Sequence, residues 1–249
     1  MLTGEKMVNT LVDELNEIGL PSMAATLDKV YHSERFLNLD HLTLMSELID
    51  SEYDDKISKR INNRLRHAKL IGNPQTLGEC TDSRSREYLP NGITDVLSSL
   101  AFIHDGLNVC ILGSSDSGKT YLAKALGIAA CNDFKVEYHH CESFLESMVA
   151  LKEEDYQKYE RKMKLLEKLN LLILDDFLLH TITDEREIKV LFAVLEKRCE
   201  VSKSTIVCSQ REPKSWASMI LNDEVASNAI MKRATKHYTV VINTKSVES

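Results

Sequence analysis

The residues best suited to chemistry lie between Gly113 and Thr120, where the chain reads Gly-Ser-Ser-Asp-Ser-Gly-Lys-Thr. This stretch satisfies the pattern G-x-x-x-x-G-K-[ST], in which backbone N–H groups surround phosphates. A helix that follows such a loop directs its free N–H groups and the positive end of its dipole at the anion. The pattern predicts a nucleotide site made of Gly113, Ser114, Ser115, Asp116, Ser117, Gly118, Lys119, Thr120 and Tyr121.

Two adjacent carboxylates, Asp175 and Asp176, follow the apolar run 171–174. Beside a phosphate loop, Asp175 would hold Mg²⁺ together with the Thr120 hydroxyl, and Asp176 would orient or deprotonate the attacking water. The alternative is that the two acids only end a strand and start a loop. The phosphate loop favours the catalytic interpretation, with Lys119, Asp175 and Asp176 as catalytic residues.

Two further side chains are candidates for contact with the terminal phosphate. Gln210 follows an expected strand, at the edge of a parallel sheet where ligands bind, and could orient the water; an ordinary polar turn is the alternative. Arg233 is expected on a helix that begins near Asp223. It could neutralise transition-state charge in a neighbouring subunit, and a solvated surface charge is the alternative.

The segments that must position these residues alternate between apolar strands and helices from about Asn91 onward, which indicates a parallel α/β sheet. We therefore predict the α/β fold class, with a P-loop domain over 91–249 and a five-stranded parallel sheet. Helices are expected after the phosphate loop and near 142–151, 155–169 and 184–199. The strands are expected at 108–112, 135–139, 171–174, 205–209 and 238–242.

Residues 1–70 are predicted to form a small all-helical module, and 71–90, rich in turn-forming residues, a linker. The third helix, about 42–70, changes sign along its length, with acids between Asp40 and Asp55 and then only bases. Several bases on one helix can follow the phosphates of duplex DNA, and a solvated helix face is the alternative. The candidate DNA-binding residues are Lys56, Lys59, Arg60, Arg64, Arg66 and Lys69.

Composition limits the class of protein further. The 249 residues are 43% hydrophobic, enough for one substantial core and a small second one. The absence of a long apolar run or a signal-type start predicts a cytoplasmic protein without a membrane partner. The net charge of −7 argues against a uniformly positive surface, but DNA binding depends on how charge is distributed.

The six cysteines form no C-x-x-C pair, which predicts reduced and mostly buried thiols. The run His139-His140-Cys141 contains three metal-binding residue types. Adjacent residues on a strand point to opposite faces, and no second cluster has zinc spacing. We therefore expect no metal other than Mg²⁺.

Segments along nearly the whole chain resemble the IstB-type helper ATPases of insertion sequences, relatives of the DnaC-type helicase loaders within the AAA+ class. The nucleotide motifs alone are shared by many families. Their combination with the amino-terminal module and the Trp216–Arg233 region makes the resemblance specific. The similar segments are 11–23, 52–70, 113–130, 171–177, 191–210, the stretch around Trp216, and 221–242.

This resemblance implies an AAA+ domain that binds ATP between the subunits of a homo-oligomer, either a ring or a filament. It further implies assembly on duplex DNA, delivery or activation of a transposase, and no helical lid after the last strand. The family's motifs fall on Lys119 and Thr120 (Walker A), Asp175 and Asp176 (Walker B), Gln210 (sensor 1) and Arg233 (arginine finger).

Three residues depart from the family's usual pattern. Asp116 stands where the loop commonly has glycine, Gln210 replaces the common asparagine, and Asp176 is one methylene shorter than the glutamate of many AAA+ proteins. Together they predict slow ATP hydrolysis. The alternatives to a transposition helper are a helicase loader, a nucleotide-dependent DNA scaffold with negligible hydrolysis, and a small-molecule kinase.

Overall fold

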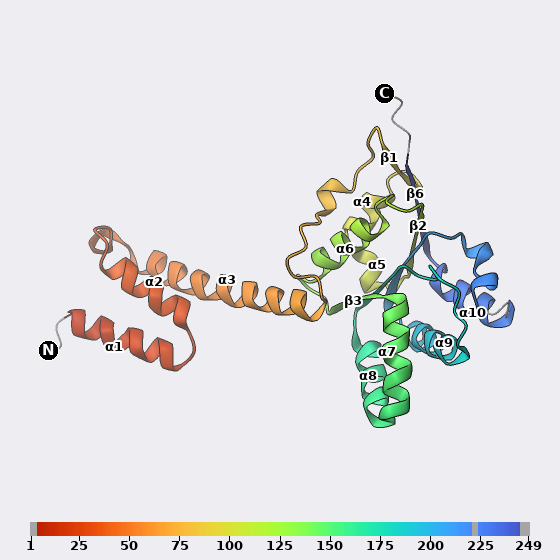
Figure 1. Cartoon of the computed structure of the whole chain (residues 1–249). Coiled ribbons are helices and arrows are strands. Elements are labelled where there is room, and N and C mark those ends of the chain that lie inside the picture. Colours follow the sequence, from red (N-terminus) through yellow and green to blue (C-terminus); the bar gives the residue numbers. More distant parts are fainter. Residues whose placement is uncertain (1–3, 221–223, 245–249) are drawn as a thin grey trace. The chain divides into compact units, whose positions relative to one another are not determined.

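The computed structural model describes residues 4–220 and 224–244, and the chain divides into two compact units, 1–63 and 64–249 (Figure 1). The division falls inside a long helix, earlier than the expected boundary at residue 70. Ala68 and Leu70 are buried in the core of the second unit, and the Ala68 carbonyl accepts a hydrogen bond from the Tyr138 N–H, 3.1 Å away. The end of the helix is therefore part of the second unit.

The first unit is all-helical, with helices α1 (Gly4–Glu17), α2 (Pro21–Tyr31) and most of α3 (His41–His67). Its small core is built around Val8, Leu27 and Leu48. The buried Glu52 carboxylate of α3 accepts hydrogen bonds from two N–H groups in the first turn of α2, each 3.0 Å away. N–H groups there have no partner within their own helix, so this contact fixes α2 against α3.

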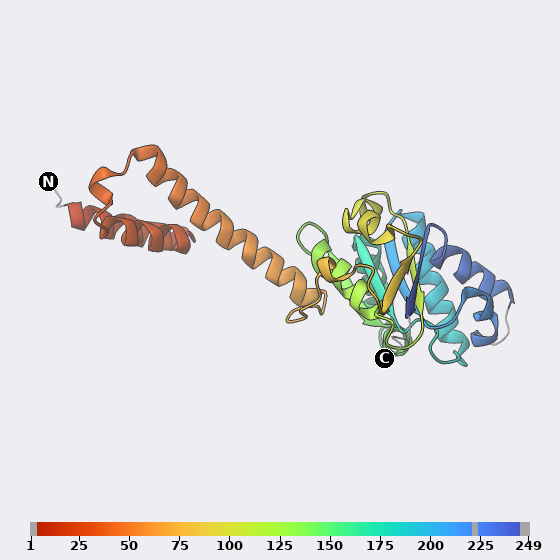
Figure 2. The same ribbon diagram turned by 90° about the horizontal axis from the view of Figure 1, so that it is seen from above.

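The second unit is built on a mixed six-stranded sheet in the order β1-β6-β2-β5-β4-β3 (Figure 2). The five expected parallel strands are all present, which confirms that part of the prediction. The sixth strand, β1, was not expected and pairs antiparallel with β6. The strands are β1 (Arg86–Leu89), β2 (Val109–Gly113), β3 (Val136–His140), β4 (Leu171–Asp175), β5 (Ser204–Ser209) and β6 (Tyr238–Thr244).

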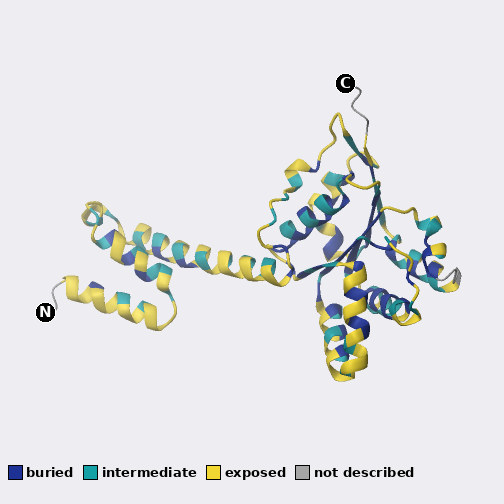
Figure 3. Ribbon diagram, viewed as in Figure 1, coloured by how far each residue is buried: buried dark blue, intermediate teal, exposed yellow. Residues whose placement is uncertain are grey.

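Helices cover both faces of the sheet (Figure 1). One face carries α4 (Ile93–Ser98), α5 (Ala101–His104) and α6 (Lys119–Ala130). The other carries α7 (Cys141–Glu154), α8 (Tyr156–Lys168), α9 (Glu185–Glu200) and α10 (Glu224–Ala234). The expected start of this last helix near Asp223 lies outside the described residues. Figure 3 shows that burial is concentrated in the sheet and on the helix sides that face it.

The segment 71–90, expected as a linker, is part of the second unit. It contains a short 3₁₀ helix, Leu77–Glu79, and β1, and it buries Cys80 and Tyr88 in the core around α6. The strand was missed because Arg-Glu-Tyr-Leu is short, half charged and followed directly by Pro90. Its pairing with β6 is a tertiary contact that local patterns do not encode.

All six cysteines are free thiols and five are buried, as expected. Burial raises the pKa of the Cys110 thiol to about 12 and that of the Cys80 thiol to about 11, so both stay protonated. Among residues 4–220 and 224–244 the structure contains no helix that combines the length and the apolar character needed to cross a membrane.

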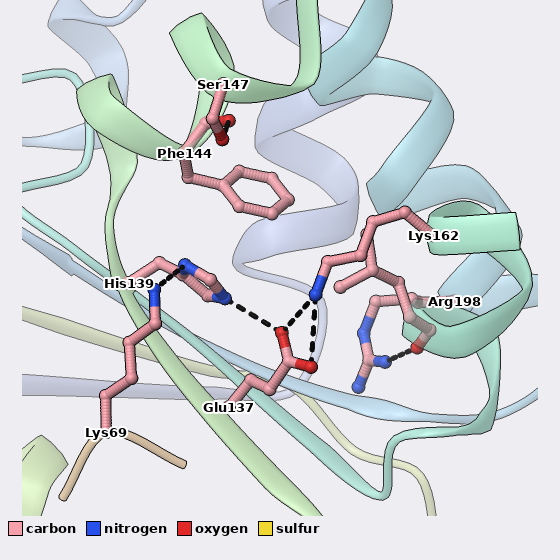
Figure 4. Close-up of polar contacts among 8 residues, drawn as sticks. Lys69, Glu137, His139, Phe144, Ser147, Lys162 and Arg198 are labelled. Atoms are coloured by element: carbon pink, nitrogen blue, oxygen red, sulfur yellow. Dashed lines mark hydrogen bonds and ion pairs between the residues drawn. The ribbon is translucent and has the colours of Figure 1, made fainter. Parts of the chain in front are cut away.

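A polar network closes the outer edge of the sheet at β3 (Figure 4). The Glu137 carboxylate accepts hydrogen bonds from Lys162 Nζ, at 2.8 and 3.1 Å, and is paired with His139 Nε2 at 2.9 Å. Burial opposes ionisation of Glu137, but the bonds from His139 and Lys162 outweigh it and lower its pKa to about 2. Nearby, the buried Arg198 donates to the Thr205 hydroxyl and to the backbone carbonyls of Leu166, Leu169 and Ser204.

The lowered pKa of Glu137 predicts a pH-dependent contribution to stability. A carboxylate with a folded-state pKa of about 2 and an ordinary value of 4.5 stabilises the fold above pH 4.5, and this stabilisation is lost as pH falls through about 2. Glu137→Gln should therefore lower the free energy of unfolding by about 3 kcal/mol at most near pH 7, and by progressively less below pH 4.5. Urea unfolding from pH 7 to pH 3 measures the difference in the free energy of unfolding between Glu137→Gln and the unmodified protein.

The exposed Glu185, on α9, gives a matched control. Glu185→Gln should produce a small difference from the unmodified protein at every pH. A difference in unfolding free energy between Glu137→Gln and the unmodified protein that stays constant from pH 7 to pH 3 would contradict the stabilising role of the ionised Glu137 carboxylate.

Candidate nucleotide site

The phosphate loop connects the central strand β2 to the first turn of α6. A Cβ atom on Gly113 would lie 2.5 Å from the Ser117 hydroxyl oxygen and 2.7 Å from the Ile242 carbonyl oxygen, so only glycine fits. Gly118 has φ +102°, in the left-handed region that glycine tolerates best. The backbone of the loop therefore depends on glycine at both of these positions.

Asp116 also adopts the left-handed conformation, with φ +58°, which glycine tolerates best. Aspartate tolerates these angles better than most residues. Its side chain is exposed, and the Ser115 hydroxyl lies 3.4 Å from its carboxylate. The backbone of the loop therefore accommodates Asp116, and its effect on hydrolysis stays a prediction.

The loop's polar side chains fit a bound triphosphate. Lys119 is only 7% exposed, and its Nζ donates to the Ser114 carbonyl at 2.5 Å. Burial lowers the pKa of Lys119, while Asp175 and other nearby acids oppose that shift. The Ser117 hydroxyl is buried beside Gly113, without a hydrogen-bond partner among the described residues.

The remaining predicted loop contacts lie in the first turn of α6. Thr120 is half-buried there, one residue after Lys119. The Tyr121 hydroxyl donates to the Glu79 carboxylate and accepts a hydrogen bond from the Thr76 N–H, 3.3 Å away. Tyr121 therefore ties α6 to the segment that leads into β1.

The two acidic residues lie at the carboxyl end of β4. Asp175 is 1% exposed, and its carboxylate accepts hydrogen bonds from the Tyr138 hydroxyl at 2.6 Å and from the Asp176 N–H at 3.0 Å. Asp176 has φ +53°, which turns the chain sharply, and its carboxylate lies 3.1 Å from His140 Nδ1. Ligand atoms of His140, Asp175 and Asp176 all lie within 4.8 Å of one another.

Tyr138 and His140 are site residues that sequence reasoning missed. Both lie on β3, which pairs with β4 so that His140 is opposite Asp175. His139 contacts Glu137 while His140 contacts Asp176, so the two histidines have separate partners. The alternation of side chains along β3 was visible in the sequence. Only the pairing of β3 with β4 shows that Tyr138 and His140 lie beside the Asp175–Asp176 pair. Burial and the bond to Asp175 raise the pKa of Tyr138, which keeps it a neutral donor.

The structure brings Gln210 to the phosphate loop. Gln210 is exposed just beyond β5 and lines a 530 Å³ cavity together with Gly113 and Ser114. The loop that carries it is anchored by Trp216, whose indole N–H donates to the Arg211 carbonyl at 3.1 Å. The Trp216 ring is fully buried, with its centroid 5.0 Å from that of Phe177, the residue after Asp176.

Arg233 lies on α10, at the other end of the sheet from the phosphate loop. Its backbone carbonyl accepts a hydrogen bond from the side chain of Asn108, 2.7 Å away, and Asn108 directly precedes β2. The Arg233 guanidinium pairs with Glu196 and lies 4.7 Å from the centre of the Phe192 ring. Arg233 therefore does not reach its own subunit's phosphate loop.

The predicted DNA-binding residues differ in their surroundings. Lys56 and Lys59 pair along α3 with Glu52 and Asp55. Arg64 donates to the Cys131 carbonyl at 3.2 Å and to that of Asn132, at the end of α6, and Lys69 Nζ lies 3.4 Å from His139 Nδ1. Arg60 and Arg66 are exposed. The run therefore contains a structural residue, Arg64, as well as exposed cations.

The order of the strands and the position of the phosphate loop define the class of protein. The loop follows β2, the two carboxylates follow β4, and β5 lies between these strands and ends beside Gln210. This is the arrangement of a P-loop nucleotide-binding fold.

Comparison with known proteins identifies the family. The sequence profile described as IstB-like ATP binding protein matches residues 13–248. A putative insertion sequence ATP-binding protein of Sinorhizobium fredii, y4pL, is 31% identical over 91% of this chain and 90% of its own length. The insertion sequence IS21 putative ATP-binding protein of Pseudomonas aeruginosa is 27% identical over 85% of this chain and 80% of its own length. The chain belongs to the IstB-like family of ATP-binding proteins.

Solved structures agree with this fold. The DnaC helicase loader matches with a TM-score of 0.53 and 19% identity, covering 70% of this chain and 99% of that chain. AMPPCP-bound DnaA from Aquifex aeolicus matches with a TM-score of 0.55 and 22% identity, covering 70% of this chain and 51% of that chain. At these identities the likeness shows the fold alone.

The contact between Tyr138 and Asp175 predicts a defect in metal use. Tyr138→Phe keeps the packed ring but removes the hydroxyl that orients the carboxylate, and groups that orient a metal ligand typically contribute 10- to 100-fold to metal affinity. We expect the Mg²⁺ concentration that gives half-maximal ATP hydrolysis to rise about tenfold. The control is Tyr156→Phe, because Tyr156 is 59% exposed on α8. Equal Mg²⁺ requirements for Tyr138→Phe and the unmodified protein would rule this role out.

Proposed function

We propose that this protein is a DNA-dependent ATPase that assembles on duplex DNA and recruits or activates the transposase of its insertion sequence, with slow ATP hydrolysis as a switch. The observation that carries the proposal is the meeting of the phosphate loop, the Asp175–Asp176 pair and Gln210 at one end of the sheet. Family membership supports ATP as the nucleotide.

In this proposal the chain's own groups divide the chemistry. Lys119 and the loop N–H groups hold the phosphates, and Asp176 orients or deprotonates the attacking water with help from Gln210. Asp175, positioned by Tyr138, and Thr120 would hold Mg²⁺, which supplies positive charge to the phosphate oxygens. The short Asp176 side chain and the contact with His140 both limit how far the carboxylate reaches, which favours slow turnover.

Assembly is inferred from the position of Arg233. An arginine that cannot reach its own phosphate loop can act as a finger only in a neighbouring subunit. Such a role requires Arg233 to exchange Glu196 for a phosphate, since the two side chains are paired in the single chain. We propose on this basis a homo-oligomer, ring or filament, with a nucleotide at each interface.

The amino-terminal unit, 1–63, and the rest of α3 are proposed to bind DNA. The relatives named as insertion sequence ATP-binding proteins support a role in transposition. Exposed cations on α3, Arg60 and Arg66, are suited to phosphate contacts. The transposase is proposed as the protein partner.

A helicase loader is the second candidate function, because the fold covers nearly the whole of the DnaC helicase loader. The two functions differ in the protein partner. In a pull-down with the purified protein as bait, the transposase of its own element should be retained. Retention of a replicative helicase in place of the transposase would favour the helicase-loader function.

The switch role predicts a specific effect of Asp176→Asn. The change keeps size and hydrogen-bonding capacity but removes the charge that activates water, so ATP hydrolysis with DNA should fall at least 100-fold while ATP affinity stays within a few-fold. Asp105→Asn, at an exposed position, is the control. Transposition should fall with hydrolysis. Full transposition by Asp176→Asn would support instead a scaffold whose hydrolysis is dispensable.

The DNA role predicts a change in salt dependence. The Arg60→Ala and Arg66→Ala double variant should bind duplex DNA more weakly, and the slope of log affinity against log salt should become shallower by about 1.8, because each phosphate that is no longer neutralised reduces it by about 0.9. Arg35→Ala is the control, because Arg35 is a cation outside the basic run 56–69. An unchanged affinity and slope would show that these arginines form only a solvated face.

A further inference from the structure

Arg86, on the unexpected strand β1, lies directly against the phosphate loop. A Cβ atom built on Gly118 would lie 2.9 Å from the Arg86 guanidinium carbon, 3.0 Å from Nη1 and 3.2 Å from Nε. Within the sheet, Arg86 pairs with Thr244, two residues beyond Ile242, which pairs with Gly113. The strand pairing therefore delivers a guanidinium to the place where the loop becomes α6.

The guanidinium lacks a full set of partners. Arg86 Nε is buried and has no hydrogen-bond partner among the described residues. Burial raises the pKa of Tyr88, and a side-chain hydrogen bond with Arg86 and the positive charge of Arg86 oppose that shift. A buried cationic N–H group without a partner is costly, so an anion that accepts from it would be stabilised.

The order of the strands decides which part of the nucleotide Arg86 faces. β2 is flanked by β5 on one side and by β6 on the other. Gln210 and the Asp175–Asp176 pair approach from the β5 side, where the proposed function places hydrolysis of the terminal phosphate. Arg86 approaches from the β6 side, beside the first turn of α6, so it faces the end of the phosphate chain nearer the nucleoside.

The segment that carries Arg86 is fixed to the same helix by a second contact. Tyr121, three residues after Gly118, is bonded through its hydroxyl to Glu79 and Thr76. Asp82 accepts a hydrogen bond from the Tyr88 N–H at 2.7 Å, which orders the turn before β1. These contacts restrict the position of Arg86 relative to the loop.

We propose that Arg86 is a phosphate-binding residue for the inner, α and β, phosphates of the bound nucleotide. A planar guanidinium can donate two parallel hydrogen bonds to phosphate oxygens, which suits this position. The inference rests on ATP binding within the proposed function and adds a contact from outside the Walker motifs. The segment 71–90 is then one wall of the nucleotide site.

The test compares three variants of the full chain by direct binding of fluorescent ATP and ADP, with inorganic pyrophosphate as a competitor. Arg86→Ala should weaken ATP, ADP and pyrophosphate binding by similar factors, about 10- to 100-fold, as expected when charge-assisted hydrogen bonds are removed. Arg86→Lys should lose less affinity, because lysine keeps the positive charge but cannot donate two parallel hydrogen bonds. Arg84→Ala, on the exposed turn just before β1, should bind all three as the unmodified protein does.

Three results would overturn the proposal. Unchanged affinities would leave Arg86 with a packing role only, a loss for ATP alone would place it at the terminal phosphate, and a loss for ADP without pyrophosphate would place it at the nucleoside. Thermal unfolding without nucleotide checks the fold of each variant. If Arg86→Ala fails to fold, the Arg86→Lys variant tests the proposal instead. Unchanged affinities for ADP and pyrophosphate in a folded Arg86→Lys variant would contradict the two parallel hydrogen bonds from the guanidinium.

The binding assay contains neither DNA nor transposase. A protein whose nucleotide affinity depends on Arg86 but whose hydrolysis ignores DNA would therefore contradict the proposed function and leave this inference intact.

Discussion

The structure depends on holding one carboxylate, Asp175, at the end of a strand that is otherwise entirely apolar and buried. A buried charge is costly unless hydrogen bonds and an opposite charge accompany it. The Tyr138 hydroxyl and the Asp176 N–H provide the bonds, and the buried Lys119 lies close enough for Asp175 to raise its pKa against the effect of burial. The positions of β3, β4 and the phosphate loop are therefore coupled through this one side chain.

The same coupling extends to the other reactive groups. Phe177 follows the acidic pair and packs on Trp216, which holds the loop of Gln210, so the turn at Asp176 and the loop of Gln210 share one anchor. On the opposite flank, β1 and the segment before it bring Arg86 and Tyr121 together around the start of α6. In our proposal the nucleotide site is assembled from both flanks of β2, and only its outermost charge, Arg233, comes from another subunit.

The parts predictable from sequence are those encoded by local patterns. The phosphate loop, the Asp175–Asp176 pair and all five parallel strands follow from spacing and apolar runs, and the structure has the strands where we expected them. Tyr138, His140 and Arg86 were missed because each acts through a strand partner far away in sequence: β4 for the first two and β6 for the third. The charged run on α3 was visible, but Arg64's bonds to carbonyls at the end of α6 were not.

The central claim is that each nucleotide site is completed by a neighbouring subunit. The most direct measurement mixes two variants that are each inactive alone: Lys119→Ala, which lacks a working phosphate loop but retains Arg233, and Arg233→Ala, which has the reverse defect. ATP hydrolysis with duplex DNA is followed as the ratio of the two is varied. We predict that hydrolysis reappears in the mixtures and is greatest at intermediate ratios. Mixtures that stay as inactive as either variant, or an Arg233→Ala protein that is fully active alone, would contradict the account.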